Sequence, residues 1–205
     1  MLGESENKKN KTILEDHVAK VKTLEDLLAE QAVRKAVTAY SRGADRCDVE
    51  ILKSAFHPDA EVKYGSYDGP YEPFCQNVVD GHLTMNYTSH TVINQYYDID
   101  ARSGKGAGEI YVLAFLSTSQ SGDVMDVKAY KEKKSEGVFD YVVAGRYVDQ
   151  YECRDEDWRI IHRQYIYDWS RTTDYAGHDP NGLFEGLIYR GKRDKNDLSY
   201  RYLKD

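Results

Sequence analysis

Cysteine is scarce in this sequence and forms no recognisable pattern. The three cysteines, Cys47, Cys75 and Cys153, are odd in number, far apart and never in a C-x-x-C pair. A disulfide scaffold needs paired cysteines, and no flanking signature marks any of the three as a catalytic nucleophile. We therefore expect reduced thiols that pack as small hydrophobic residues, as in a cytoplasmic protein.

Long apolar runs and clustered positive charge are also missing. No window approaches the run of about 18 apolar residues that a transmembrane helix needs, and the polar start MLGESENKKNK lacks the apolar core of a signal peptide. The formal net charge is −7, and acidic residues interrupt the one basic run, YRGKRDKND. Nucleic-acid binding needs a clustered positive face. Neither a membrane nor nucleic acid is therefore an expected partner.

Phenylalanine is rare, and tyrosine takes its place. The chain has 5 Phe residues against 18 Tyr residues. A tyrosine ring is apolar, but its hydroxyl group forms hydrogen bonds. This composition suits a hydrophobic pocket that also donates hydrogen bonds.

The first part of the chain has the spacing of amphipathic helices. Apolar residues recur every three or four positions from Thr12 to Tyr40, which predicts two helices, the firmer one over 23–45. Thr23, followed by acidic residues, is typical of a helix N-cap. A shorter helix is predicted over 47–56 and another over 70–86.

The second part of the chain is rich in strands, because the apolar period changes from about 3.6 to 2 after residue 86. Strands are predicted over 60–69, 87–100, 108–120, 139–155 and 156–169. Helices followed by strands with mostly short connections indicate an α+β fold with an antiparallel sheet.

The expected domain organisation has three parts. A disordered tail covers 1–11, one domain covers 12–171, and a C-terminal extension covers 172–205. An insert over 121–137 separates two of the strands, and the residues do not indicate its role.

One predicted strand carries a histidine among apolar and amide neighbours. By alternation His90, Val92 and Asn94 share one face of the strand 87–100. Histidine has an unperturbed pKa of about 6.5 and is a useful general base when a carboxylate holds its other ring nitrogen. Asp45, at the end of the long helix, is the candidate for that carboxylate. A break of the helix at Gly43 would turn it and Tyr40 toward one cavity.

The last predicted strand offers an arginine for the same cavity. Alternation places Arg163, Tyr165 and Tyr167 on one face and residues such as Trp158 and Ile160 on the other. Alternation alone does not show which face is concave. The neighbouring acidic group that begins at Asp149 has the pattern of an exposed strand end.

Each candidate also has a structural interpretation. A strand histidine is often a packing residue, an aspartate at a helix end is often a cap, and a tyrosine at a helical core position usually packs. On residue types alone, both interpretations of Asp45, His90 and Tyr40 stay open. His57 and Asp59 lack a third ligand at suitable spacing, so no metal site is expected.

Three segments stand in this order along the chain: YSRGADRCDVEILKSAFHPDAEV, YTSHTVINQY and VVAGRYVDQYECRDEDWRIIHRQYIYDWSR. Together they resemble the SnoaL-like proteins of the nuclear transport factor 2-like superfamily. The resemblance runs from Thr23 to Arg171. It implies a cone-shaped α+β barrel, in which N-terminal helices close a strongly curved antiparallel sheet around a deep apolar pocket.

The same resemblance implies a function. Relatives include scytalone dehydratase, bile-acid dehydratases, a dehydrochlorinase and polyketide cyclases, several of which use a histidine base held by an aspartate. By position, the histidine is similar to His90, the aspartate to Asp45, the assisting tyrosine to Tyr40 and an arginine of the last strand to Arg163. The expected substrate-binding side chains lie on the same faces: Val92, Asn94, Tyr165 and Tyr167.

We therefore expect a cofactor-free lyase or isomerase that acts on a hydrophobic cyclic small molecule, with dehydration as the preferred reaction. The strand segment IYVLAFL carries no acidic residue where some bile-acid dehydratases have one. The alternatives are a polyketide cyclase, or a non-catalytic ligand-binding or assembly module on the same fold. Because the outer face of such a sheet needs covering, we expect a homo-oligomer, either a dimer or a trimer.

Overall fold

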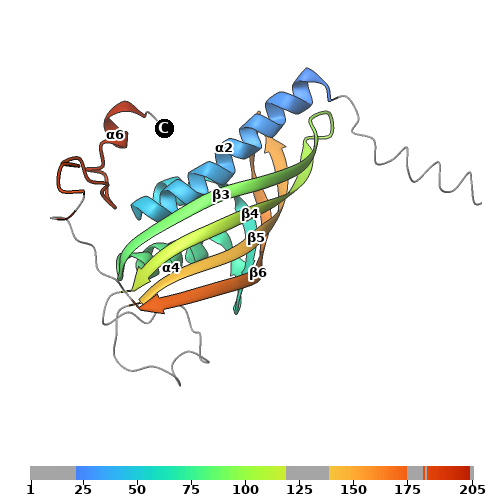
Figure 1. The fold of residues 1–205 in the computed structure, drawn as a ribbon. Coiled ribbons are helices and arrows are strands. Elements are labelled where there is room, and N and C mark those ends of the chain that lie inside the picture. Colours follow the sequence, from blue (N-terminus) through green and yellow to red (C-terminus); the bar gives the residue numbers. More distant parts are fainter. Residues whose placement is uncertain (1–21, 119–138, 175–181, 183, 204–205) are drawn as a thin grey trace, which may run out of the picture.

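The computed structural model describes residues 22–118, 139–174, 182 and 184–203. The predicted tail over 1–11 and the insert over 121–137 lie outside these ranges. Helix α2 lies lengthwise against a large curved sheet, with the remaining helices on the same side of the sheet or beyond its edge (Figure 1). The described helices are α2 (Leu24–Arg46), α3 (Val49–Ser54), α4 (Tyr71–Leu83) and α6 (Ser199–Tyr202).

Helix α2 begins where the sequence predicts and ends within one residue of the predicted end at 45. The hydroxyl of Thr23 accepts a hydrogen bond from the backbone nitrogen of Asp26 at 3.1 Å, and the Asp26 carboxylate accepts one from the backbone nitrogen of Thr23 at 3.1 Å. This reciprocal capping confirms the predicted N-cap. The helix does not break at Gly43, the position considered for a break above, but continues to Arg46 and ends at Cys47, which has a φ of 50°.

The glycine at position 43 has a different role. A β-carbon there would lie 2.4 Å from the backbone nitrogen of Leu52 in α3. Gly43 therefore permits close packing of α3 against α2. Asp48 accepts hydrogen bonds from the backbone nitrogens of Glu50 and Ile51, so it is the N-cap of α3.

The sheet has six described strands in the order β2-β1-β6-β5-β4-β3. Strands β1 and β6 pair in parallel, and all other described neighbours are antiparallel, so the expectation of a purely antiparallel sheet is wrong at this one pair. The sheet is not closed on itself, since β2 and β3 are its edges. Their bounds are β1 (Phe56–Tyr64), β2 (Tyr67–Pro70), β3 (Met85–Asp100), β4 (Lys105–Thr118), β5 (Phe139–Arg154) and β6 (Asp157–Asp174).

Bulges in the strands change which side chains face inward. Part of the face assignment predicted from alternation is therefore wrong. The register of β3 against β4 shifts between Val92 and Gln95, and Asn94 is exposed while Tyr97 is buried. A shift between β5 and β6 likewise puts Ile160 on the buried side together with Arg163. A bulge adds one residue to a strand and reverses the faces beyond it, which simple alternation does not foresee.

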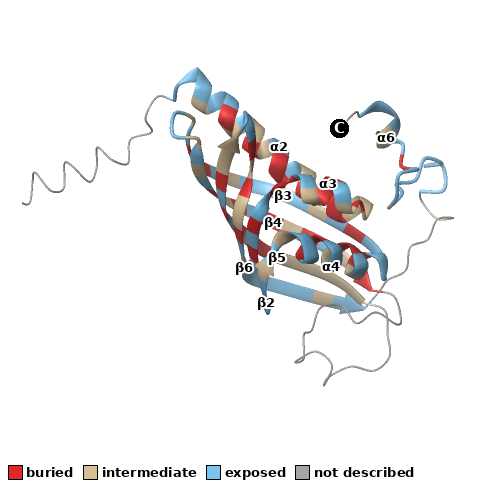
Figure 2. Cartoon of the chain, turned by 180° about the vertical axis from the view of Figure 1, so that it is seen from behind, coloured by how far each residue is buried: buried red, intermediate tan, exposed pale blue. Residues whose placement is uncertain are grey.

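The hydrophobic core fills the space between the inner face of the sheet and the helices. Buried residues gather on the inner face and on the helix surfaces that cover it (Figure 2). Cys75 is fully buried, Cys47 and Cys153 are half-buried, and all three thiols are free, as expected. None of the described helices is long and apolar enough to cross a membrane.

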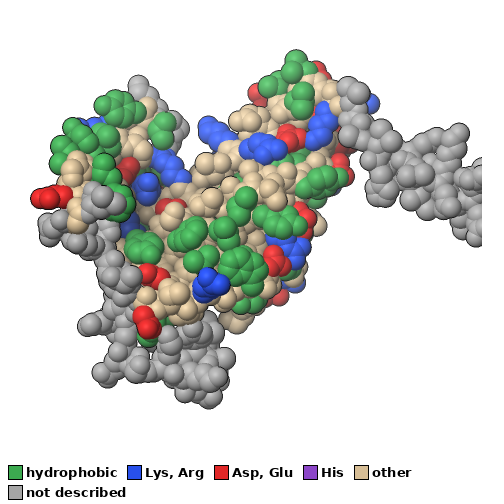
Figure 3. All heavy atoms as spheres, in the orientation of Figure 1, with side chains coloured by type: hydrophobic (Ala, Val, Ile, Leu, Met, Phe, Trp, Pro, Cys, Tyr) green, Lys and Arg blue, Asp and Glu red, His purple; other side chains and the backbone are tan. Residues whose placement is uncertain are grey.

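The outer face of the sheet is exposed and partly hydrophobic. Hydrophobic side chains cluster over the front of the molecule (Figure 3). Among them, Tyr111 is 39% exposed, Phe115 40% and Val148 41%. Arg146 on β5 bridges Glu109 on β4 at 2.6 Å and Asp168 on β6 at 2.9 Å across this face.

We predict that Gly43→Ala destabilises the fold. The added β-carbon would meet the Leu52 backbone, which cannot move aside as a flexible side chain can. The free energy of unfolding should fall by about 1–3 kcal/mol, measured by denaturant titration. The matched control is Gly81→Ala in α4, where no heavy atom lies within 4 Å, and there a gain of about 0.5–1 kcal/mol is expected. Equal effects of the two changes would contradict this account.

Candidate active site

The predicted pair of Asp45 and His90 is present in the structure. The Oδ1 atom of Asp45 lies 2.7 Å from the ring Nδ1 of His90, and Oδ2 accepts a hydrogen bond from the backbone nitrogen of His90 at 2.8 Å. Both side chains are largely buried, with 15% and 8% of their surfaces exposed. Two bonds to one residue fix both the position and the rotation of the imidazole.

The secondary structure explains why these two residues meet. Asp45 lies in the last turn of α2, and His90 lies on β3, which is an edge strand. An edge strand leaves part of its backbone N–H groups without a strand partner. The His90 N–H is therefore available to the carboxylate.

Asp45 is held in its ionised form. Burial alone would raise the pKa of this carboxyl, but hydrogen bonds and charge from His90 outweigh burial, so the pKa lies below its ordinary value. An ionised carboxylate only accepts hydrogen bonds, so Nδ1 of His90 must carry the proton. In the neutral ring, Nε2 then has a free lone pair. Nε2 has no hydrogen-bond partner within the described part of the chain.

A second histidine, His82 in the last turn of α4, lies beside the pair. Its ring centroid is 5.3 Å from that of His90, and its Nδ1 lies 3.1 Å from the backbone oxygen of Ala44. Because a carbonyl oxygen only accepts, this nitrogen is the donor. Burial, together with the nearby His90, lowers the pKa of His82 to about 4, so its ring is neutral at physiological pH.

Arg163 and Tyr40 form a separate, deeper cluster. Arg163 is fully buried, and its Nε and Nη2 atoms donate to the two Asp149 oxygens at 2.8 and 2.6 Å. Its Cζ atom lies 4.2 Å from the Tyr40 ring centroid and 4.0 Å from that of Tyr147. Tyr151 donates a hydrogen bond to Asp149 at 3.0 Å. The guanidinium is therefore paired with one acid and surrounded by aromatic rings.

Arg163 keeps its positive charge and Tyr40 keeps its proton at physiological pH. Burial opposes the charge on Arg163, but Asp149 outweighs it and holds the pKa of the guanidinium above its ordinary value. Burial raises the pKa of Tyr40 to about 12, so the phenol keeps its proton and can donate it in a hydrogen bond. Nη1 of Arg163 is buried and has no hydrogen-bond partner among the described residues.

The two clusters are not linked by polar or ring interactions. No hydrogen bond or ring contact joins His90 to Tyr40 or to Arg163 in the residues described. Two surface hollows, one by the β3–β4 turn and one over Trp169, also lie away from His90. The structure thus brings Asp45 and His90 together and keeps the predicted assisting residues at a second location.

The four predicted substrate-binding residues have different surroundings. Val92 packs against the core, and Tyr165 stacks on Tyr64 with ring centroids 4.2 Å apart. Asn94 is exposed because of the bulge in β3, so the prediction that it shares the face of His90 is wrong. Tyr167 is 59% exposed and does not continue the buried face of Arg163.

Sequence reasoning missed two residues of this region. Asp149 was interpreted as part of an exposed strand end, but it is 0% exposed. Alternation with Tyr147 and Tyr151 would have placed it on the inner face. His82 had no distinguishing signal, because its role depends on the contact between α4 and β3.

No metal centre is apparent in this region. Within the described ranges, no group of three or more His, Cys, Asp and Glu side chains is placed to hold a metal ion. His57, considered as a ligand above, instead has its Nε2 3.0 Å from the backbone oxygen of Glu152.

The fold and the site together define the class of this protein. A curved six-stranded sheet covered on one face by a long helix is the cone-shaped fold of the nuclear transport factor 2-like superfamily. The sequence profile of the SnoaL-like domain matches residues 25–164. The chain therefore belongs to the SnoaL-like family.

Solved structures with this fold include several named as eliminating enzymes. The hexachlorocyclohexane dehydrochlorinase LinA type 2 has a TM-score of 0.59 and 20% identity, over 78% of this chain and 99% of that one. LinA type 3 from Novosphingobium barchaimii has a TM-score of 0.54 and 22% identity, over 76% of this chain and 95% of that one. A proposed scytalone dehydratase from Novosphingobium aromaticivorans has a TM-score of 0.56 and 21% identity, over 77% of this chain and 96% of that one. No curated protein sequence matches the chain.

We predict that His82 makes the fold sensitive to acid. Its pKa is about 4 in the folded state, against about 6.5 unfolded, so between these values only the unfolded chain binds the proton. Stability therefore falls as the pH drops from about 6.5 to about 4, by about 3 kcal/mol in all. His82→Asn keeps a side-chain N–H donor but does not titrate, so its unfolding free energy should change less over this range. An unchanged slope would contradict the assignment.

We also predict that Asp149→Asn is strongly destabilising. The substitution keeps the shape of the side chain but leaves the buried Arg163 charge without a counter-charge. The loss of unfolding free energy should be about 3–5 kcal/mol, measured by denaturant titration. Tyr151→Phe, which removes only one hydrogen bond to Asp149, is the control and should cost about 1 kcal/mol. Similar losses in the two variants would show that the charge pair is not the cause.

Proposed function

We propose that this protein is a cofactor-free lyase or isomerase in which His90 removes a proton from a carbon atom of a hydrophobic cyclic substrate. The observation that supports it most directly is the Asp45–His90 pair, whose carboxylate sets the tautomer and leaves Nε2 with a free lone pair. A histidine so oriented is an effective general base near neutral pH.

Elimination is the reaction class we favour. In this step Nε2 of His90 takes the proton, the electron pair of the C–H bond becomes the new double bond, and hydroxide or halide leaves from the neighbouring carbon. Asp45 stabilises the imidazolium that forms. The imidazolium then returns its proton to a leaving hydroxide, or to solvent when halide leaves. The dehydratase and dehydrochlorinase among the structural neighbours agree with this class.

Tyr40 and Arg163 would assist the leaving group. The phenol of Tyr40 keeps its proton, and Nη1 of Arg163 is a buried donor with no partner among the described residues. Because the leaving group is on the carbon next to the one that loses its proton, this role requires the substrate to lie between Nε2 of His90 and the cluster of Tyr40 and Arg163. Hydrogen bonds to a developing anion are strongest in such a dry, preorganised environment.

A second candidate is a non-catalytic ligand-binding or assembly module. The interior around Arg163 is occupied by buried side chains, among them Tyr147, which is 1% exposed. The exposed apolar side chains of the outer sheet face, such as Phe115, form a surface that a second copy of the chain would cover. The homo-oligomer and the cytoplasmic location both stay predictions.

The test compares variants on a defined panel of substrates. The wild-type chain is incubated in D2O with scytalone and with hexachlorocyclohexane, and mass spectrometry follows product formation and deuterium uptake at carbon. His90→Ala and Asp45→Asn should each lower turnover by about 10²–10⁴-fold, with the fold intact by circular dichroism, because the base or its orientation is lost.

His162→Ala is the matched control. This histidine lies on β6, where it pairs in register with Gln150 and Glu61 and not with the Asp45–His90 pair. Its activity should stay close to that of the wild type. Near-normal turnover by His90→Ala would refute the proposal. Binding of these compounds by the wild type without turnover or deuterium uptake would favour the module instead.

A further inference from the structure

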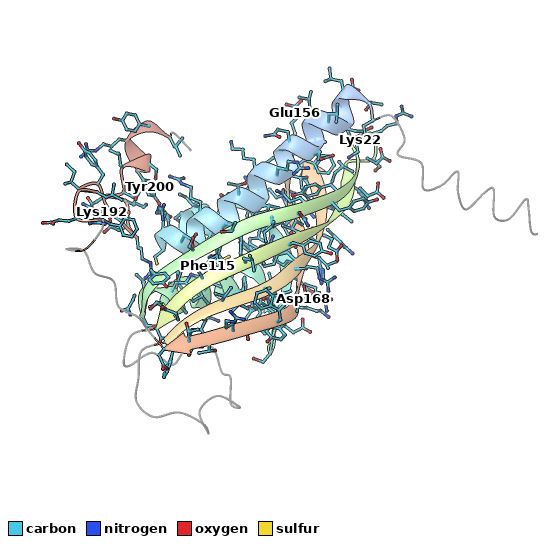
Figure 4. All side chains as sticks on the ribbon, in the orientation of Figure 1. Lys22, Phe115, Glu156, Asp168, Lys192 and Tyr200 are labelled. Carbon is cyan, nitrogen blue, oxygen red and sulfur yellow. The ribbon has the colours of Figure 1, made fainter. Side chains whose placement is uncertain are left out.

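The C-terminal extension returns to the site that the SnoaL-like domain provides. The family match ends at residue 164, and the longest described segment of the extension covers 184–203. This segment lies beside the C-terminal end of α2, with Lys192 and Tyr200 on it (Figure 4). Its contacts are made largely by polar and charged side chains, which sets it apart from the apolar core.

Arg193 makes the most extensive of these contacts. Its Nη1 donates to the backbone oxygen of Met85 at 2.7 Å, and its Nη2 donates to the backbone oxygen of His82 at 2.6 Å. Nη2 also lies 3.3 Å from Sγ of Cys47 and 3.5 Å from Oγ1 of Thr88. The terminal carbonyls of a helix need such partners, and an arginine side chain can supply them.

The residues that Arg193 contacts lie next to the candidate active site. His82 and Met85 are on either side of the short connection between α4, which carries His82, and β3, which carries His90. Cys47 follows Asp45 by two residues. One guanidinium therefore touches all three segments that carry Asp45, His82 and His90.

A second anchor holds the extension in place. The hydroxyl of Tyr200 donates to Oδ2 of Asp48 at 2.9 Å, while Oδ1 of Asp48 caps α3. The Tyr200 ring lies 4.6 Å from Cζ of Arg42. Asp197 lies 3.7 Å from Arg46 in the last turn of α2. These contacts fix the segment from which Arg193 extends.

We propose that Arg193 is a positioning residue of the Asp45–His90 pair, which acts by tying the end of α4 to the start of β3. The inference rests on the proposed function for its catalytic meaning, but the geometry that it describes is testable without a substrate. The C-terminal extension then contributes to the geometry of the site through Arg193.

Electrostatics support this assignment. The charged or titratable groups that face His82 are His90 from β3, Asp45 from α2 and Arg193 from the extension. Burial is the largest cause of the low pKa of His82, and the positive charge of Arg193 lowers that pKa further. Removal of Arg193 should therefore raise the pKa of His82.

Nuclear magnetic resonance of the full chain with ¹⁵N-labelled histidine is the test. In the wild type we expect a protected downfield Nδ1–H signal from His90, bonded to Asp45, and a His82 ring that stays neutral down to about pH 4. In Arg193→Ala the His90 proton should exchange about tenfold faster. The titration midpoint of His82 should rise, because the positive charge of Arg193 no longer disfavours the protonated ring. Lys192→Ala, an exposed neighbour, is the control and should match the wild type.

Arg193→Lys keeps the inference testable if Arg193→Ala does not fold. A lysine keeps the charge but reaches only one of the two carbonyl oxygens, so the His90 proton should still exchange faster than in the wild type while the His82 midpoint stays close to it. Wild-type exchange in whichever of the two variants folds would overturn the inference. That result is distinct from failure of the proposed function, which is decided by the turnover of His90→Ala.

Discussion

The site depends on one carboxylate that makes two bonds to a single residue of an edge strand. Asp45 holds both the ring and the backbone of His90, and this joins the end of α2 to β3. Inside a sheet, the backbone N–H of a strand residue would be engaged by its neighbours on one side or the other. The arrangement is available here because β3 is the last strand of the sheet. Position in the sheet, and not residue type alone, therefore fixes the orientation of His90.

The interior of the cone contains two polar groups that are satisfied in different ways. Asp45 and His90 keep slight exposure, whereas Arg163 and Asp149 are fully buried and neutralise one another at short range. A buried charge without such a partner would be very costly. The rings of Tyr40 and Tyr147 pack over the guanidinium, and the hydroxyl of Tyr151 donates a hydrogen bond to Asp149.

The C-terminal extension lies outside the matched family domain but contacts it. The SnoaL-like match ends before the extension begins, yet Arg193 contacts the turn between α4 and β3. These contacts are polar and are directed at carbonyl groups. They therefore fix the orientation of α4 relative to β3 and bury little apolar area. The domain alone supplies the pair of Asp45 and His90, and the extension acts on the elements that carry it.

Much of the fold could be predicted from local patterns. The N-cap at Thr23, the helices before the sheet and the long strands follow from capping chemistry and from apolar periodicity, which are properties of neighbouring residues. The pairing of Asp45 with His90 was predicted from the resemblance to a family and from the chemistry of a general base. The residues alone left it open, because 45 positions separate the two along the chain.

Other features were decided only by the tertiary structure. The bulge after Val92 turned Asn94 outward, and α2 continues through Gly43, where α3 packs closely against it. His82 and Arg193 join the site through contacts between segments that no local pattern specifies. The sequence by itself thus determined the helices and strands, since these depend on short-range preferences. Which side chains meet depended on register and packing, which are set by the whole chain at once.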